Sequence, residues 1–310
     1  MAILALALPH IHRLAEVGLA QFGLIHTGLA HTGLTQAELA EVGPSCEPLG
    51  PAGWEQPGSA WTSLAFVVAG LLIALDIVIK RRKQAAPSQC PHGRCSADES
   101  PSADRGQAAS GRCRRGLPPA APNTSHGSPH STSPWGMAWV MAVMAVGNGI
   151  GSVIQHGPAP RWNPIVHDPP LMGALAVVLA VALADITGRH LRSWWWAAPT
   201  ALTALLAWLW PPAASASMAL VAVPAIALSL WRMRIRPDLR LRIGLAVAIL
   251  AAGALVGSLS VVGGPWCRPG SAWFDAGWSG HMIWHVLAAA SLWIIAPTLQ
   301  PAPQPTFPPP

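Results

Sequence analysis

The sequence predicts an all-α, polytopic membrane protein: a bundle of seven transmembrane helices. Of its 310 residues, 52% are hydrophobic and only 10% are charged, whereas a soluble domain carries about 25% charged residues. The apolar residues gather in seven blocks close to the roughly 20 residues that a spanning helix needs. Many of the 16 tryptophans lie near block ends, as expected of an interfacial aromatic belt. We therefore expect an integral, multi-pass membrane protein, in the cell membrane if the source is prokaryotic.

The seven blocks follow one another closely after a long first connection. The predicted spans are residues 60–79, 135–155, 170–188, 194–210, 213–231, 243–262 and 278–297. Between the fourth and fifth spans stand only Pro211 and Pro212. Proline ends a helix because its ring clashes with the preceding turn and it has no N–H to donate. A tight turn between antiparallel helices is therefore predicted at this pair.

The basic residues indicate how the bundle is oriented. They follow the first span ("KRRK", 80–83), the third (Arg189 and Arg192) and the fifth ("WRMRIRPDLRLR", 231–242). Because basic loops stay on the cytoplasmic side, the N-terminus is predicted outside and the C-terminus inside. The net charge of +6 then reflects topology, and we expect no nucleic-acid partner.

Three segments are expected to lie apart from the membrane domain at 45–300. Residues 1–44 reuse GL-x-x-TGL units and lack the basic start and cleavage site of a signal peptide. They fit a peripheral helix, a disordered arm or a mis-chosen start codon. Residues 84–134, rich in Ser, Pro, Gly and Arg, are predicted to be a disordered cytoplasmic loop. Its "CPHGRC" is a poor match to a zinc knuckle, and the tail at 301–310 is a polyproline-like coil.

Ionisable residues inside a membrane are costly and mark functional sites by default. Ser152 and His156 share one face at the end of the second span, and Asp168 stands at the mouth of the third. His281 and His285 are four residues apart at the start of the seventh. Because the second span runs outward and the other two run inward, all five residues are predicted to lie at a similar depth near the outer face.

Three imidazoles with an open fourth position form the ligand set of a hydrolytic zinc site. A nearby carboxylate can act as base and a hydroxyl can hold water or an oxyanion. Each element also has a plainer explanation. A serine in a membrane helix usually bonds a carbonyl or a neighbouring helix, histidines near a helix end can face interfacial water, and Asp168 before two prolines can be a helix N-cap.

The two cysteines beside the spans, Cys46 and Cys267, both fall on the predicted outer face. Disulfides persist in that environment. A bridge between them would tie the first helix to the seventh, and we state it as a hypothesis.

At these motifs the chain resembles the alkaline ceramidase group of the CREST superfamily, which also contains the adiponectin-receptor-like (PAQR) proteins. That family carries S-x-x-x-H on the second of seven helices, Asp at the start of the third and H-x-x-x-H on the seventh. The matching segments here are "GSVIQH", "HDPP" and "GHMIWHVLAA". "EQPGSAWTSLAFVVAG" and "SCEPLG" are similar to family segments at and before the first helix. The resemblance covers about residues 45–298.

The resemblance implies a role for each candidate. His156, His281 and His285 would be the zinc ligands, Asp168 the base or water-orienting group, and Ser152 the hydroxyl that positions water or oxyanion. It implies hydrolysis of the amide of an N-acyl lipid, ceramide being the best-known substrate of the family, which enters from the bilayer.

The chain departs from the family around the calcium site that some alkaline ceramidases carry. Ser45 replaces a tryptophan, and of the acidic residues only Glu47 and Glu55 remain, so calcium is not expected as a cofactor. Two other functions stay open: a receptor or membrane-organising protein with a structural zinc, and a transporter. Spans four to six carry almost no ionisable residue, which disfavours transport, and no oligomeric state is predicted.

Overall fold

A computed structural model describes residues 42, 45–51, 53–85, 136–262 and 264–300. The N-terminal extension apart from Val42, nearly all of the loop at 84–134 with its "CPHGRC", and the tail at 301–310 lie outside the described residues. Within the described ranges every regular element is a helix, so the predicted all-α class is confirmed.

The long helices match the predicted spans in number and order. They are α3 (Pro57–Ala85), α4 (Gly136–His156), α5 (Asn163–Thr187), α6 (Trp194–Leu209), α7 (Pro211–Ile235), α8 (Arg240–Leu259) and α10 (Gly280–Ile295). Three short elements join them: η2 (Pro237–Leu239), α9 (Ala272–Asp275) and η3 (Ala296–Thr298). In the described residues, six helices are long and apolar enough to cross a membrane. The exception is α6, whose 16 residues span about 24 Å.

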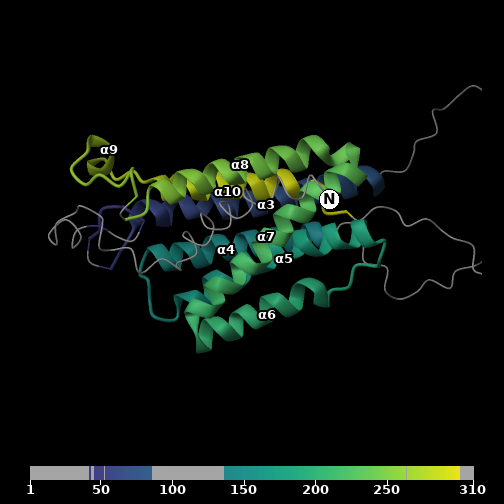
Figure 1. Cartoon of the computed structure of the whole chain (residues 1–310), viewed down its shortest axis with the longest axis horizontal. Coiled ribbons are helices and arrows are strands. Elements are labelled where there is room, and N and C mark those ends of the chain that lie inside the picture. The colour runs from purple at the N-terminus through teal and green to yellow at the C-terminus, as the bar shows by residue number, and fades with distance from the viewer. Residues whose placement is uncertain (1–41, 43–44, 52, 86–135, 263, 301–310) are drawn as a thin grey trace, which may run out of the picture.

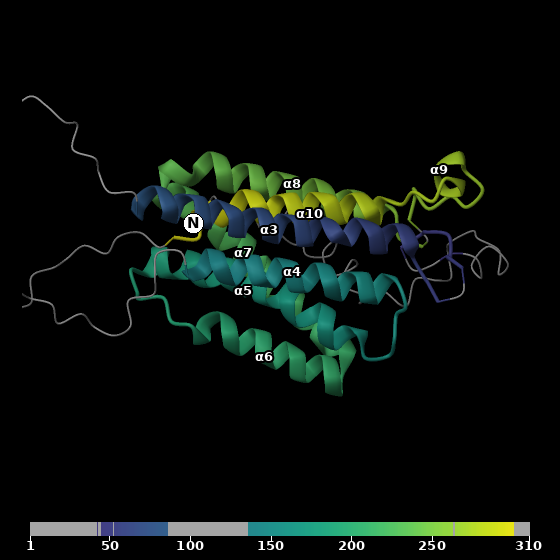
Figure 2. The same cartoon turned by 180° about the vertical axis from the view of Figure 1, so that it is seen from behind.

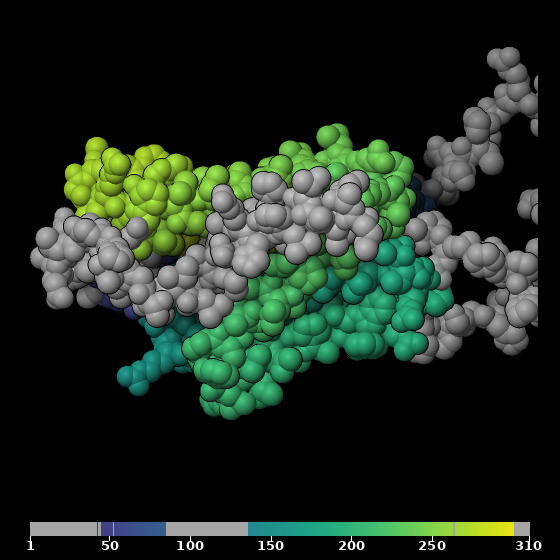
Figure 3. All heavy atoms as spheres, in the orientation of Figure 1, coloured from purple at the N-terminus to yellow at the C-terminus, as the bar shows by residue number. Residues whose placement is uncertain are grey.

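The helices run side by side in an elongated bundle (Figures 1 and 3). Helix α3 packs on α4, α4 on α5, and α5 on both α6 and α7, while α10 lies between α3 and α8. Figures 1 and 2 show α3, α8 and α10 along one side of the bundle and α4, α5 and α6 along the other. Large apolar side chains such as Leu220, Trp208 and Leu241 stay exposed on the outside. Such a surface is typical of helices that face lipid, where burying apolar groups gives no gain.

The two ends of the bundle differ in character. Helices α3, α5 and α7 all end at one end, which we call the basic end, because basic residues occupy the last turns of α3 and α7 and also follow α5. Helix α4 ends, and α5 and α10 begin, at the opposite end, which we call the site end. The core between the two ends is apolar and includes Ile77, Met141, Val177 and Val181.

The third helix starts earlier than predicted. The span expected from residue 170 begins at Asn163, so Asp168 lies inside α5 and is not its N-cap. The two prolines that suggested a boundary, Pro169 and Pro170, are within the helix. They lie beyond the first turn, so the carbonyls of Ile165 and Val166 have no N–H partner four residues on. The predicted turn at Pro211 is confirmed, since α7 begins at that residue.

A buried ion-pair cluster at the basic end was not anticipated from the sequence. Arg232 on α7 donates from Nε to Asp185 Oδ2 on α5 at 2.6 Å, and their side chains are only 3% and 2% exposed. A terminal nitrogen of Arg232 also donates to the Thr298 carbonyl at 2.7 Å. Arg236 adds a contact to Asp185 at 3.3 Å. The cluster thus joins α5, α7 and the end of the last helix.

We predict that Asp185→Asn lowers the free energy of unfolding by about 3–5 kcal/mol, because it leaves the buried Arg232 without its carboxylate. Asp76→Asn is the matched control, since Asp76 pairs with Lys80 at a partly exposed i, i+4 site worth at most about 0.5 kcal/mol. Unfolding in detergent, followed by circular dichroism, measures both variants. Equal losses in the two would contradict a stabilising role for the buried cluster.

Candidate metal centre

Three histidines from two helices meet at the site end of the bundle. His156 is the last residue of α4, and His281 and His285 occupy the first two turns of α10. Their candidate ligand atoms all lie within 4.8 Å of one another. The centroid of the His156 ring lies 5.0 Å from that of His281 and 4.9 Å from that of His285. The predicted cluster is therefore present, and it can hold a metal ion.

The arrangement fits a tetrahedral metal. Zinc binds imidazole nitrogen at about 2.0–2.1 Å, which places neighbouring ligand atoms about 3.4 Å apart. The 4.8 Å limit on the separations here is wider than that value. His156 and His285 are buried and His281 is half-buried, so the ligands are shielded but one side is open. Among the described residues no fourth Cys, His, Asp or Glu joins this group.

Hydrogen bonds from the first turns of α3 orient two of the three rings. His156 Nδ1 donates to Gln56 Oε1 at 2.6 Å. His285 Nδ1 lies 3.1 Å from the Ser59 carbonyl, 3.2 Å from Ser63 Oγ and 3.3 Å from Thr62 Oγ1. A histidine that donates from Nδ1 keeps Nε2 free as a metal ligand, and such outer partners tune metal affinity.

The backbone fixes where each histidine stands. The carbonyls of His156 and Gly157 at the end of α4 accept from the N–H groups of Gln56 and Glu55 at 2.7 and 2.9 Å, which satisfies groups that a helix end leaves unpaired. Helix α10 begins with Ser279 as N-cap, whose hydroxyl accepts from Met282 N. These caps tie α4 to the start of α3 and set the first residue of α10.

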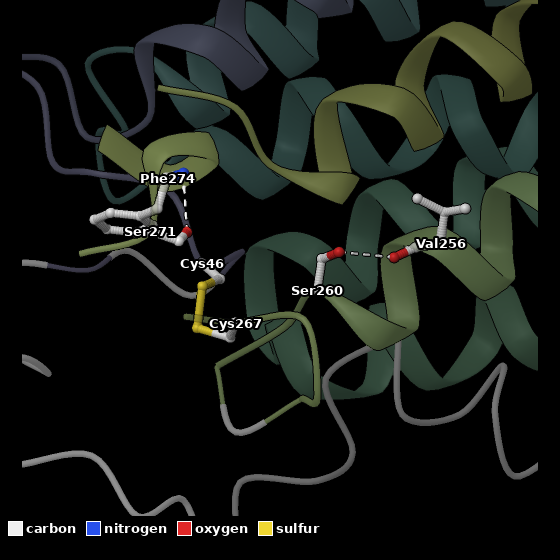
Figure 4. Close-up of a disulfide and its surroundings, with 6 residues drawn as sticks. All are labelled: Cys46, Val256, Ser260, Cys267, Ser271 and Phe274. Atoms are coloured by element: carbon white, nitrogen blue, oxygen red, sulfur yellow. Dashed lines mark hydrogen bonds between the residues drawn. A yellow bond between two sulfur atoms is a disulfide. The ribbon is translucent and has the colours of Figure 1, made fainter. Parts of the chain in front are cut away.

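Helix α8 approaches the start of α10 closely at Gly280. A Cβ on Gly280 would lie 2.7 Å from the Val256 carbonyl on α8 and would also collide with Ser260. Figure 4 shows Ser260, whose hydroxyl donates to that carbonyl, near the disulfide. The Trp284 ring packs against α8 at Gly253, where a Cβ would lie 3.1 Å from the ring. A larger residue at 280 would therefore displace the helix that carries two of the three ligands.

The hypothesised disulfide between Cys46 and Cys267 is present, with a Cα–Cα distance of 5.5 Å (Figure 4). It packs with Val42, Val262 and Phe274 at the site end. The bridge links the segment before α3 to the segment before α10, the two segments that lead into the candidate site.

Of the two other predicted site residues, Ser152 is connected to the histidine cluster by hydrogen bonds, whereas Asp168 contacts His167. Ser63 Oγ donates to Ser152 Oγ at 2.8 Å, which connects Ser152 to His285 through one hydroxyl. The hydrogen bond that the structure gives the Asp168 carboxylate comes from His167 Nδ1 at 2.8 Å, and not from one of the three histidines. His167 is near enough to all three to act on them electrostatically.

A close backbone contact joins α4 and α5 next to Ser152 and Asp168. A Cβ on Gly151 would lie 2.8 Å from His167 Cα, and it would also meet the Val166 carbonyl. The residue after Gly151 is Ser152, and the residue after His167 is Asp168. Only glycine permits α4 to approach α5 this closely at the site end.

The sequence analysis missed the polar face of α3 as part of the site. Gln56, Ser59 and Ser63 are spaced i, i+3 and i+7, which places them on one side of a helix. All three are buried. A polar stripe at this spacing in an otherwise apolar span is the signal that could have identified them.

A shallow apolar groove lies against the outer side of α10 next to the site. Its volume is about 180 Å³, and it is lined by Thr62, Trp278, Met282, Ile283, Val286 and Leu287. Thr62 connects the groove to the metal centre, since its hydroxyl lies 3.3 Å from His285 Nδ1. The lining is apolar elsewhere, so the groove suits a hydrocarbon chain.

Comparison with known proteins gives no relative: no family model, no curated protein and no solved structure matches the chain.

We predict that the purified protein holds about one zinc ion per chain and that His285→Ala loses it, because two imidazoles cannot hold the ion at comparable affinity. His190→Ala is the matched control, since His190 is exposed just after α5, at the basic end. Elemental analysis of the detergent-purified variants gives the stoichiometry. Wild-type protein free of any transition metal would refute the assignment.

Proposed function

We propose that the chain is a zinc-dependent intramembrane hydrolase of amide bonds in amphipathic lipids, related to the alkaline ceramidases. The observation that carries the proposal is the meeting of His156, His281 and His285 within 4.8 Å in an apolar helical bundle. Catalytic zinc sites use three protein ligands and an open position, whereas structural ones are closed by a fourth ligand.

The bound metal supplies Lewis acidity and makes hydroxide available at neutral pH. We assign the remaining steps to the chain's own groups. Asp168 takes the proton of the attacking water and passes it to the leaving amine, since the nitrogen must be protonated before the C–N bond breaks. Ser152 donates to the carbonyl oxygen as it gains negative charge.

His167 supports Asp168 in this scheme. Its Nδ1 donates to Asp168 Oδ1 at 2.8 Å, and its side chain is 15% exposed while that of Asp168 is 7% exposed. The bond holds the carboxylate in one orientation, and the partial exposure gives the pair contact with the outside of the bundle.

The substrate class follows from where the site lies. Helices with apolar outer faces surround it, so a substrate that resides in the bilayer can approach from the side. The groove beside α10 suits one hydrocarbon tail of such a lipid. We further propose that all seven long helices cross the membrane. The basic residues at the ends of α3 and α7 and after α5 then favour a cytoplasmic basic end, with the N-terminus and the site end at the outer face.

We predict that the zinc-loaded protein releases fatty acid from at least one member of a panel of N-acyl lipids, and that Asp168→Ala lowers kcat by about 10²–10⁴-fold. Mass spectrometry of the released acid and amine measures turnover. The matched control is Asp275→Ala, since Asp275 is an exposed aspartate in α9, also at the site end, and its loss is expected to leave the rate unchanged.

Two outcomes would contradict the proposal. Zinc-loaded protein that hydrolyses no lipid of the panel would favour a receptor or membrane-organising role with a structural metal. Full turnover by Asp168→Ala would remove the aspartate from the reaction even if hydrolysis occurs.

A further inference from the structure

We propose that Glu47 is a positioning residue of the metal centre: its buried carboxylate holds the first turn of α3, and that turn fixes His285 through the Ser59 carbonyl. The inference rests on the proposed function for its catalytic meaning, but the geometry on which it stands does not require any reaction. Glu47 lies outside the helices, immediately after Cys46, and no step assigned above uses it.

Among the described residues, the hydrogen bonds of the Glu47 carboxylate all go to the start of α3. Its oxygens accept hydrogen bonds from the Gly58 N–H, the Ser59 N–H and the Ser59 hydroxyl. The first N–H groups of a helix have no partner within the helix, so an outside acceptor satisfies them. The negative charge also interacts favourably with the helix dipole at this end. Glu47 therefore caps α3 from a neighbouring segment.

The fit around the carboxylate is close. Glu47 is 1% exposed and Ser59 is fully buried. A Cβ on Gly58 would lie 2.9 Å from Glu47 Oε1, so glycine at this position lets the carboxylate reach the backbone. Burial raises the pKa of Glu47 above its ordinary value, against the opposing effect of the hydrogen bonds from Ser59 and Gly58. Acceptance of hydrogen bonds, more than negative charge, is thus what the site requires of this residue.

Ser59 transmits this constraint to the metal centre. Its N–H and hydroxyl face Glu47, while its carbonyl accepts from His285 Nδ1 at 3.1 Å. The Ser59 carbonyl also accepts from Ser63 Oγ at 2.7 Å, and Ser63 bonds Ser152 in turn. One residue, Ser59, is therefore held by Glu47 on one side and orients a candidate metal ligand on the other.

The segment that carries Glu47 is itself anchored. Cys46 has a φ of 51°, in the left-handed region that residues other than glycine seldom adopt. The disulfide to Cys267 holds the chain at this turn, and Glu47 is the next residue. A continuous series of covalent and hydrogen bonds therefore runs from the disulfide through Glu47 and Ser59 to His285.

The experiment measures metal affinity without substrate. Wild type, Glu47→Ala and Glu47→Gln are stripped of metal and titrated with Zn²⁺ against a chromogenic chelator, and with Co²⁺ as a spectroscopic probe. We expect Glu47→Ala to bind Zn²⁺ about 10–100-fold more weakly, the usual effect of losing an outer partner of a metal site. Its Co²⁺ absorption bands should shift as well. We expect Glu47→Gln to bind nearly as wild type, because an amide can accept from the two N–H groups and donate to the Ser59 hydroxyl.

Two controls separate positioning from stability and from surface charge. Asp185→Asn destabilises the fold at the basic end and should leave the Zn²⁺ affinity unchanged. Glu55→Ala removes an exposed carboxylate from the same segment and should also have no effect.

Unchanged Zn²⁺ affinity in Glu47→Ala would overturn the inference, as would an equal loss in Asp185→Asn. Calcium that tightens Zn²⁺ binding to wild type but not to Glu47→Gln would overturn it too, since Glu47 would then be a calcium ligand. Protein that shows the expected affinities but hydrolyses no lipid would refute the proposed function and leave this inference standing.

Discussion

The start of α3 and the residue before it hold two of the three candidate ligand histidines in place, and the rest of the candidate site depends on this contact. An imidazole in an apolar bundle needs a partner for one nitrogen before the other can be presented to a metal. Gln56 provides that partner for His156, and the Ser59 carbonyl provides it for His285. Because these residues belong to one short stretch of chain, the orientation of α4 and α10 at the site end is set by a single element.

The two ends of the bundle solve the burial of polar groups in different ways. At the basic end a full charge is matched by a full charge, since Arg232 meets Asp185 in an almost completely buried pair. Around the histidines the contacts are made mainly by hydroxyls, an amide and backbone carbonyls. Because these partners are neutral, none of them repels an incoming metal cation. The rigid ion pair and the polar, metal-ready pocket are separated by the apolar core around Met141 and Val177.

Much of the fold and of the ligand set could be predicted from the sequence because the physical signals are local. Apolar blocks of membrane length locate the helices, and histidines four residues apart lie on one helix face whatever surrounds them. The predicted start of α5 was wrong because a pair of prolines usually marks a helix boundary, whereas this helix continues through both of them. The partners of the histidines were missed because Gln56 and Ser59 act through tertiary contacts that the spacing of "EQPGS" alone does not reveal. The cluster of Asp185 and Arg232 was missed for the same reason: 47 positions separate the two along the chain.

The order of the helices has a consequence for how the protein is made. Two of the three candidate ligands lie on α10, the last long helix, while the groups that orient them lie on α3, the first. During synthesis, therefore, the early helices can be inserted and packed while the metal pocket does not yet exist. The pocket is completed only when the last helix docks and the bridge from Cys46 to Cys267 closes over it. A metal held by the three histidines would therefore bind only late in biogenesis, after the C-terminal helix has arrived.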